Sequence, residues 1–156
     1  MKDIFQEGLE MSYGDAPYDI HIEAKAIGGD ILASVTGGTR PHIGAVALAE
    51  PADARHPVTG DPLGGGTKGG DPSLGDTYAQ DAYSSQDANS PRVALLSAFG
   101  HKDALLAEMF AYGLCERFGT TVCAAAGVHV DGAGPDEIAL MVENAKTLLA
   151  LVLAKQ

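Results

Sequence analysis

Three of the five histidines in this chain of 156 residues lie in short strings that contain glycine. His42 stands in Pro-His-Ile-Gly, His101 in Gly-His-Lys-Asp, and His129 in Gly-Val-His-Val-Asp-Gly. Histidine can act as an acid, a base, a hydrogen-bond donor or a metal ligand near neutral pH, and glycine lets backbone approach a ligand closely. Because each string begins or ends a predicted strand or helix, we expect the fold to gather the three histidines at one edge.

Two segments offer donors to an anion. His101 and Lys102 precede a predicted helix, whose first N–H groups and dipole favour negative charge. Thr39 and Arg40 end the string Thr-Gly-Gly-Thr-Arg, which combines hydroxyl, backbone and guanidinium donors suited to phosphate or carboxylate oxygens. Both segments also have a purely structural interpretation, which remains open. In the first, Asp103 would cap the helix while His101 and Lys102 are merely exposed. In the second, the residues would form an ordinary turn.

His129 interrupts the most apolar predicted strand, and Asp131 follows it by two positions. In a strand the two side chains share a side, so the carboxylate could orient the imidazole of a base, or both groups could bind a metal. A histidine hydrogen-bonded within the core is the plain alternative. His42, His101 and His129 could also bind zinc with a water as fourth ligand, although their spacing matches no recognised zinc motif.

Five segments have the composition and patterning of β-strands. Strict alternation over residues 19–26, then a Gly-Gly-Asp turn and residues 31–35, predicts a hairpin. Residues 120–130 form a nearly continuous apolar run, which is typical of a central strand covered on both faces. The other two predicted strands are residues 43–49 and 92–99.

Two helices are predicted, one before and one after the strand at residues 120–130. Residues 103–118 carry apolar side chains at helical spacing, and residues 135–152 begin with Pro-Asp-Glu, which suits a helix N-terminus. The second helix is expected to bury a stripe from Ile138 to Val152. This order predicts one α+β domain, with a mainly antiparallel sheet and the two C-terminal helices packed on it. Residues 50–91, rich in Gly, Pro, Asp and Ser, are expected to form a long loop or insertion.

Composition excludes several classes of function. The formal net charge of −11 would repel a phosphate backbone, so nucleic acid is not an expected partner. The acidic start of the chain does not resemble a secretory signal, and no apolar stretch is long enough for a membrane span. A cytoplasmic location is therefore expected, with Cys115 and Cys123 as a buried, reduced pair.

The histidine strings and their order also resemble a known family. Thr-Gly-Gly at residues 36–38, Pro-His-Ile-Gly-Ala at 41–45, Gly-His-Lys-Asp at 100–103 and Gly-Val-His-Val-Asp at 127–131 are similar to the LpdD-like family. Its members are small D-type accessory subunits of UbiD-type hydroxyaromatic acid decarboxylases. The resemblance spans about residues 19–152, apart from the long loop.

The resemblance implies a prenylated-flavin chaperone of aromatic acid metabolism with a proteasome-assembly-chaperone-like fold that tends to form a homodimer. Such a protein would bind prenylated FMN, or FMN, and supply or mature it for the decarboxylase, which performs the chemistry. An accessory protein is thus favoured over an enzyme. The alternatives are a metal-dependent enzyme that uses the three histidines and a ligand-free assembly factor. The cofactor-binding residues implied are Thr39, Arg40, His42, His101, Lys102, His129 and Asp131.

Overall fold

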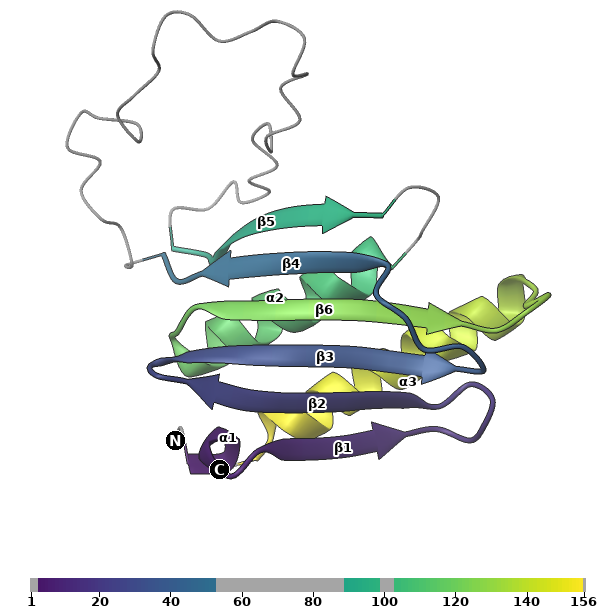
Figure 1. The fold of residues 1–156 in the computed structure, drawn as a ribbon, viewed down its shortest axis with the longest axis horizontal. Coiled ribbons are helices and arrows are strands. Elements are labelled where there is room, and N and C mark those ends of the chain that lie inside the picture. Colours follow the sequence, from purple (N-terminus) through teal and green to yellow (C-terminus); the bar gives the residue numbers. More distant parts are fainter. Residues whose placement is uncertain (1–2, 53–88, 99–102, 156) are drawn as a thin grey trace, which may run out of the picture.

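The computed structural model describes residues 3–52, 89–98 and 103–155. In these residues the chain forms a six-stranded sheet in the order β1-β2-β3-β6-β4-β5 (Figure 1). Most of the segment 50–91, predicted to be a long loop, lies outside the described residues. The elements in chain order are α1 (Asp3–Gln6), β1 (Leu9–Tyr13), β2 (Ile20–Ile27), β3 (Asp30–Gly38), β4 (Ala45–Glu50), β5 (Arg92–Ser97), α2 (Ala104–Phe118), β6 (Val122–His129) and α3 (Pro135–Leu153).

The sheet is antiparallel except between β3 and β6, which run in parallel. The predicted α+β class with a mainly antiparallel sheet is confirmed, as is the hairpin of β2 and β3. Two short elements, α1 and β1, were not expected from the sequence. Strand β1 is only five residues long, and its apolar and polar residues alternate weakly. Its pairing with β2, rather than a pattern in its own sequence, makes it a strand.

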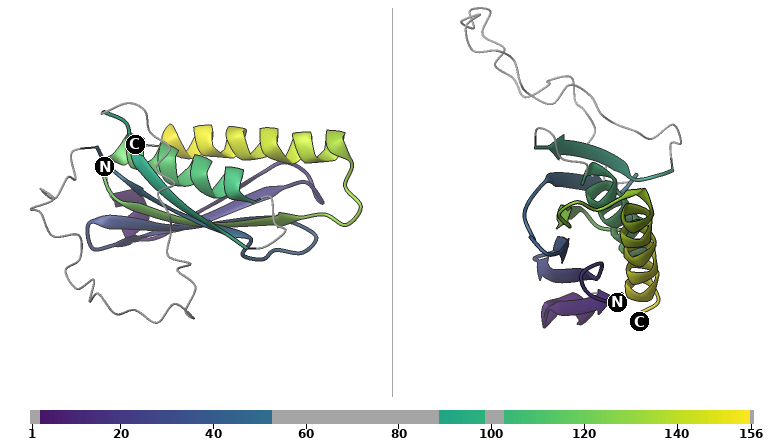
Figure 2. Two further views of the ribbon diagram at one scale, coloured as in Figure 1. Left: turned by 90° about the horizontal axis from the view of Figure 1, so that it is seen from above. Right: turned by 90° about the vertical axis from the view of Figure 1, so that its right-hand side faces the viewer.

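Both long helices pack on one face of the sheet (Figure 2). Alternate residues of β2, among them Ile20 and Ile22, point toward the helices and are fully buried, whereas their neighbours along the strand are exposed. Phe110 of α2 and Leu148 of α3 complete this core from the helix side. The helices therefore leave the second face of the sheet uncovered within the described chain.

Three details differ from the expectations. Strand β6 is covered by helices on one face only, not on both. Ile138, placed in the buried stripe of the last helix, is 44% exposed because it lies in the first turn, where α3 extends beyond the core. Cys115 is buried as expected, but Cys123 is only partly buried, and both are free thiols.

A hydrogen bond connects the loop after β1 to the start of α3. The Tyr18 hydroxyl donates to one carboxylate oxygen of Glu137, and the Gly134 N–H donates to the other at 2.6 Å. These hydrogen bonds hold the pKa of Glu137 below its ordinary value of 4.5, and the one from Tyr18 has the largest effect. A lowered folded-state pKa means that the contribution to stability is present above the ordinary pKa and is lost as pH falls through the folded-state value.

A Tyr18→Phe variant is expected to melt at a lower temperature than wild type at neutral pH. The difference should narrow at an acidic pH well below 4.5, because the Glu137 carboxylate becomes protonated in the folded state once the pH falls through its lowered pKa. Circular dichroism melts at both pH values measure this. Tyr13→Phe, at an exposed tyrosine, serves as the control, and an equal loss at both pH values would contradict the role of the Glu137 carboxylate.

No helix in the described part of the chain is both long and apolar enough to cross a membrane.

Candidate functional site

The sheet gathers the candidate residues at the C-terminal end of β6. Because β3 and β6 are parallel and in register, the end of β3 at Gly38 lies beside His129, the last residue of β6. The chain then runs through Thr39 and Arg40 to His42 along the same edge. Thr39 N–H and Arg40 N–H both donate to the His129 carbonyl, at 2.8 and 3.3 Å, which fixes this connection.

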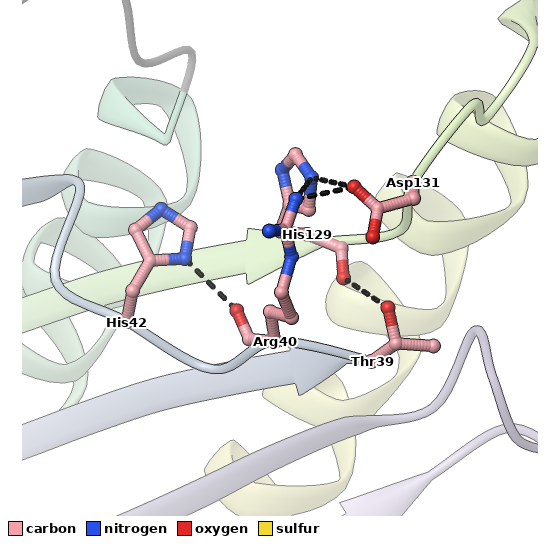
Figure 3. A network of polar contacts seen from close by, with 5 residues as sticks. All are labelled: Thr39, Arg40, His42, His129 and Asp131. Atoms are coloured by element: carbon pink, nitrogen blue, oxygen red, sulfur yellow. Dashed lines mark hydrogen bonds and ion pairs between the residues drawn. The ribbon is translucent and has the colours of Figure 1, made fainter.

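Arg40, His129 and Asp131 form a compact polar cluster (Figure 3). An Arg40 guanidinium nitrogen donates to Asp131 Oδ1 and lies 2.8 Å from His129 Nε2. The same imidazole nitrogen is 3.0 Å from Asp131 Oδ1. The predicted pairing of His129 with Asp131 is therefore present in the structure, and Arg40 joins it from the neighbouring segment.

The cluster perturbs its carboxylate. The hydrogen bond from His129 and the positive charge of Arg40 hold the pKa of Asp131 below its ordinary value of 3.8, against a smaller opposing effect of burial. The stability that this cluster contributes is therefore present above about pH 4 and is lost as pH falls further. At neutral pH Asp131 is an anion, which fixes the orientation of both of its partners.

Removing the His129 imidazole should raise the pKa of Asp131. In a His129→Ala variant we expect the pKa of Asp131 to rise toward 3.8, because the largest cause of the shift is gone while Arg40 remains. Carboxyl carbon chemical shifts followed by NMR through an acid titration measure it. His42→Ala, which removes a ring that is not among the causes of the Asp131 shift, is the control. An unchanged Asp131 titration in His129→Ala would show that His129 does not act on the carboxylate.

His42 lies beside His129 and contacts a second carboxylate. The two imidazole rings are edge to face, with centroids 6.2 Å apart. His42 Nδ1 donates to the Arg40 carbonyl at 3.1 Å, and its Nε2 lies 3.3 Å from Asp103 Oδ2. Two adjacent imidazoles, each with its own aspartate, can hold an anionic or hydrogen-bonding ligand or transfer protons to it.

Asp103 is a functional candidate that the sequence reasoning did not select. It precedes α2 as an N-cap, but its carboxylate makes no capping hydrogen bond. Instead the side chain, which is buried, accepts a hydrogen bond from the Val128 N–H at 3.0 Å and contacts His42. The helix start is thereby joined to β6 and to the histidine pair. The Gly-His-Lys-Asp string is the available signal, but its histidine and lysine, and not its aspartate, have the features typical of an anion site.

Two glycines allow these segments to meet. A Cβ atom on Gly127 would overlap the His42 carbonyl, and one on Gly44 would overlap the Asp103 carboxylate. Gly44 N–H also donates to the Ala126 carbonyl at 2.9 Å, so the segment that carries His42 lies directly against β6. The glycines in the histidine strings thus serve close approach of backbone and side chains within the protein.

A cavity of about 450 Å³ opens beside the histidines. His42, Asp103 and His129 form its polar side, and the rest of its wall is mostly aliphatic. The size and the combination of an apolar wall with a few polar groups are typical of small-molecule sites. The remaining lining residues come from the start of α2, the end of β6, the following loop and the start of α3: Leu105, Leu106, Val128, Val130, Gly132, Ala133, Ile138, Met141 and Val142.

Five of the seven residues proposed from the sequence lie together at this edge: Thr39, Arg40, His42, His129 and Asp131. His101 and Lys102 lie outside the described residues, so the predicted anion site at the start of α2 stays a prediction. Residues 36–38, which follow the strand predicted at residues 31–35, belong to β3. Among residues 3–52, 89–98 and 103–155, no group of three or more His, Cys, Asp or Glu side chains is arranged to hold a metal.

Comparison of the sequence with known protein families shows which family the chain belongs to. The sequence matches the family described as the prenylated flavin chaperone LpdD-like domain over residues 14–61 and 63–156. The match takes in nearly the whole chain, the segment 50–91 included, and the protein belongs to this family.

No curated protein matches the sequence. Among solved structures, a chain from the crystal structure of a novel chaperone complex for yeast 20S proteasome assembly is similar, with a TM-score of 0.47 and 14% identity over 93% of each chain.

Proposed function

We propose that this protein binds prenylated FMN in the cavity beside His42 and His129 and supplies or matures it for a UbiD-type hydroxyaromatic acid decarboxylase. The observation that carries the proposal is the cavity itself, because it joins an aliphatic wall to the imidazoles of His42 and His129 and the carboxylate of Asp103 in a protein of the prenylated flavin chaperone family. The protein acts in this proposal as an accessory chaperone, and the decarboxylase performs the reaction.

The residues present fit the ring system of such a ligand. A volume of about 450 Å³ lies within the usual range for cofactor pockets, and Met141, Val142 and Ile138 offer apolar contact to a flat ring. Among the described residues that line the cavity there is no Phe, Tyr or Trp. The ring is therefore held by aliphatic side chains and by methionine sulfur, which contacts aromatic faces favourably.

The polar side of the cavity would serve the heteroatoms and the phosphate. His42 and His129 can exchange hydrogen bonds with ring nitrogens and carbonyl oxygens, and Arg40, whose guanidinium lies beside His129, offers a positive charge to the phosphate. Arg40 is already paired with Asp131, so a phosphate must share or displace that contact. Bound prenylated flavin would supply the electrophilic and redox chemistry of the holoenzyme, while this chain binds, orients and shields it.

Delivery to an apo-decarboxylase tests the proposal. The protein is loaded with prenylated FMN, freed of unbound cofactor by gel filtration, and mixed with apo-decarboxylase while decarboxylation of a hydroxybenzoate is followed. The proposal expects faster or more complete activation than the same amount of free cofactor gives. Equal activation by free and protein-bound cofactor would contradict a chaperone role.

The same samples address the two alternatives. A metal-dependent enzyme would retain stoichiometric metal in elemental analysis and lose it in His42→Ala. A ligand-free assembly factor would bind the decarboxylase without carrying any flavin. We further propose that the protein acts as a cytoplasmic homodimer.

A further inference from the structure

The Asp103 carboxylate joins the start of α2 to β6 and to His42 at the wall of the cavity. The side chain is only 9% exposed. Its Oδ1 accepts a hydrogen bond from the Val128 N–H at 3.0 Å, and its Oδ2 lies 3.3 Å from His42 Nε2. Pairing of β6 with β4 ends at Ala126, so the carboxylate serves the Val128 N–H beyond the end of that pairing. One carboxylate oxygen therefore supports the fold, and the other faces the histidine.

The position of this carboxylate is fixed from two sides. The backbone carbonyl of Asp103 accepts hydrogen bonds from the Leu106 and Ala107 N–H groups, both at 3.0 Å, which anchors the residue to the first turn of α2. On the other side Gly44 lies so close that a Cβ atom there would overlap Oδ2. The carboxylate therefore has little freedom to turn away from His42.

Both nitrogens of the His42 ring lie beside oxygen atoms that accept hydrogen bonds. Nδ1 is 3.1 Å from the Arg40 carbonyl oxygen, which has no proton to donate, so Nδ1 is the donor. An ionised aspartate also only accepts. A neutral imidazole carries one N–H, and in that form Nε2 would direct its lone pair at the Asp103 carboxylate 3.3 Å away. A second proton, on Nε2, replaces this repulsion with an ion pair.

We propose that Asp103 is a positioning residue of the cavity, which keeps a proton on both nitrogens of His42 and so makes Nε2–H a donor to the ligand. The separation of 3.3 Å from Oδ2 is longer than the roughly 2.9 Å of a full N–H···O hydrogen bond, so the Nε2 proton can be shared with a second acceptor. The ligand class is one that presents an acceptor, a carbonyl oxygen or an unprotonated ring nitrogen, to this wall. This assignment rests on the proposed function, because a flavin ring carries such acceptors.

The charges around His42 agree with this role. Among the described residues that line the cavity, those that can carry a charge are His42, Asp103 and His129. His129 contacts its own carboxylate, that of Asp131, and the Arg40 guanidinium pairs with the same group, which offsets its positive charge. Within the described lining, Asp103 is therefore the residue that supplies negative charge to His42.

Nitrogen NMR of the histidine side chains tests the proton count without any ligand. At about pH 7, where histidine can take either form, both ring nitrogens of His42 should have the chemical shifts of protonated nitrogen, with His42→Ala identifying the signals. In Asp103→Asn the amide can donate to Nε2 while its oxygen still accepts from Val128, so His42 should become neutral. Asp136→Asn, the same substitution at an exposed position in the first turn of α3, is the control and should keep the wild-type signals. A neutral His42 in wild type, or an unchanged His42 in Asp103→Asn, would overturn the proposal.

A double-mutant cycle on cofactor affinity tests whether Asp103 acts through His42. Anaerobic absorbance titration with reduced prenylated FMN gives the dissociation constants. Asp103→Asn should weaken binding about tenfold when His42 is present, the effect of losing a hydrogen bond from a charged donor, and should have no effect in His42→Ala. A purely structural role for Asp103 would give the same factor in both backgrounds, and that result would overturn the proposal. If wild type binds no cofactor, the proposed function fails, and the nitrogen NMR result alone decides the role of Asp103.

Discussion

An Ile138→Glu variant is expected to bind prenylated FMN about tenfold to a hundredfold more weakly than wild type. Ile138 lines the cavity and is 44% exposed, so the substitution changes the ligand site more than the core. Burial of an aliphatic side chain of this size against a ligand contributes about 1.5–3 kcal/mol. The introduced carboxylate must also lose water when the ring binds, and it repels the phosphate.

Anaerobic titration of protein into reduced prenylated FMN, followed by absorbance, measures the dissociation constant. Leu140→Glu is the control: Leu140 lies two residues away on α3, is 46% exposed and does not line the cavity. Its affinity should equal that of wild type. If Ile138→Glu and Leu140→Glu bind the cofactor equally well, the ligand does not occupy this cavity.

Gly127→Ala is expected to lower the free energy of unfolding by about 3 kcal/mol, at the upper end of the usual cost of overpacking. The added Cβ atom would overlap the His42 carbonyl, and this is main chain, which cannot rotate out of the way. The strand or the segment that carries His42 must shift. The variant should therefore also lose cofactor affinity, because His42 moves away from His129.

Urea denaturation compares this variant with Gly134→Ala. A Cβ atom on Gly134 would meet only the end of the Glu137 side chain at 3.6 Å, an ordinary contact. As an N-cap position, Gly134 should cost no more than about 1 kcal/mol when replaced by alanine. Equal unfolding free energies for the two variants would show that β6 and the His42 segment do not depend on close approach at Gly127.

The sequence allowed the edge of the site to be predicted because its residues follow strand ends. The hydrophobic run over residues 120–130 predicted β6, and the predicted pairing of His129 with Asp131 is present, although β6 ends at His129 and Asp131 lies in the turn that follows. Arg40 joins them only because β3 and β6 are parallel and in register. Pairing between strands that are distant in the chain is not visible in local periodicity, so that contact could not be predicted.

The contacts of Asp103 and Ile138 could not be predicted from the local sequence. An aspartate before a helix is ordinarily interpreted as a cap, but here its carboxylate turns to Val128 and His42. Ile138 fits a buried helical stripe by spacing, but the first turn of α3 extends past the sheet and lines a cavity. In both cases the position of a neighbouring element, rather than the local sequence, decides what the side chain contacts.

We propose above that the cavity beside His42 and His129 holds a prenylated flavin. The most direct measurement is the flavin content of protein produced together with a flavin prenyltransferase, determined by absorbance and mass spectrometry for wild type and for a His42→Ala/His129→Ala variant with a melting curve that shows it to be folded. We expect a stoichiometric amount of prenylated FMN in wild type and a large loss in the variant. Wild-type protein that carries no flavin, or a variant that carries as much as wild type, would contradict it.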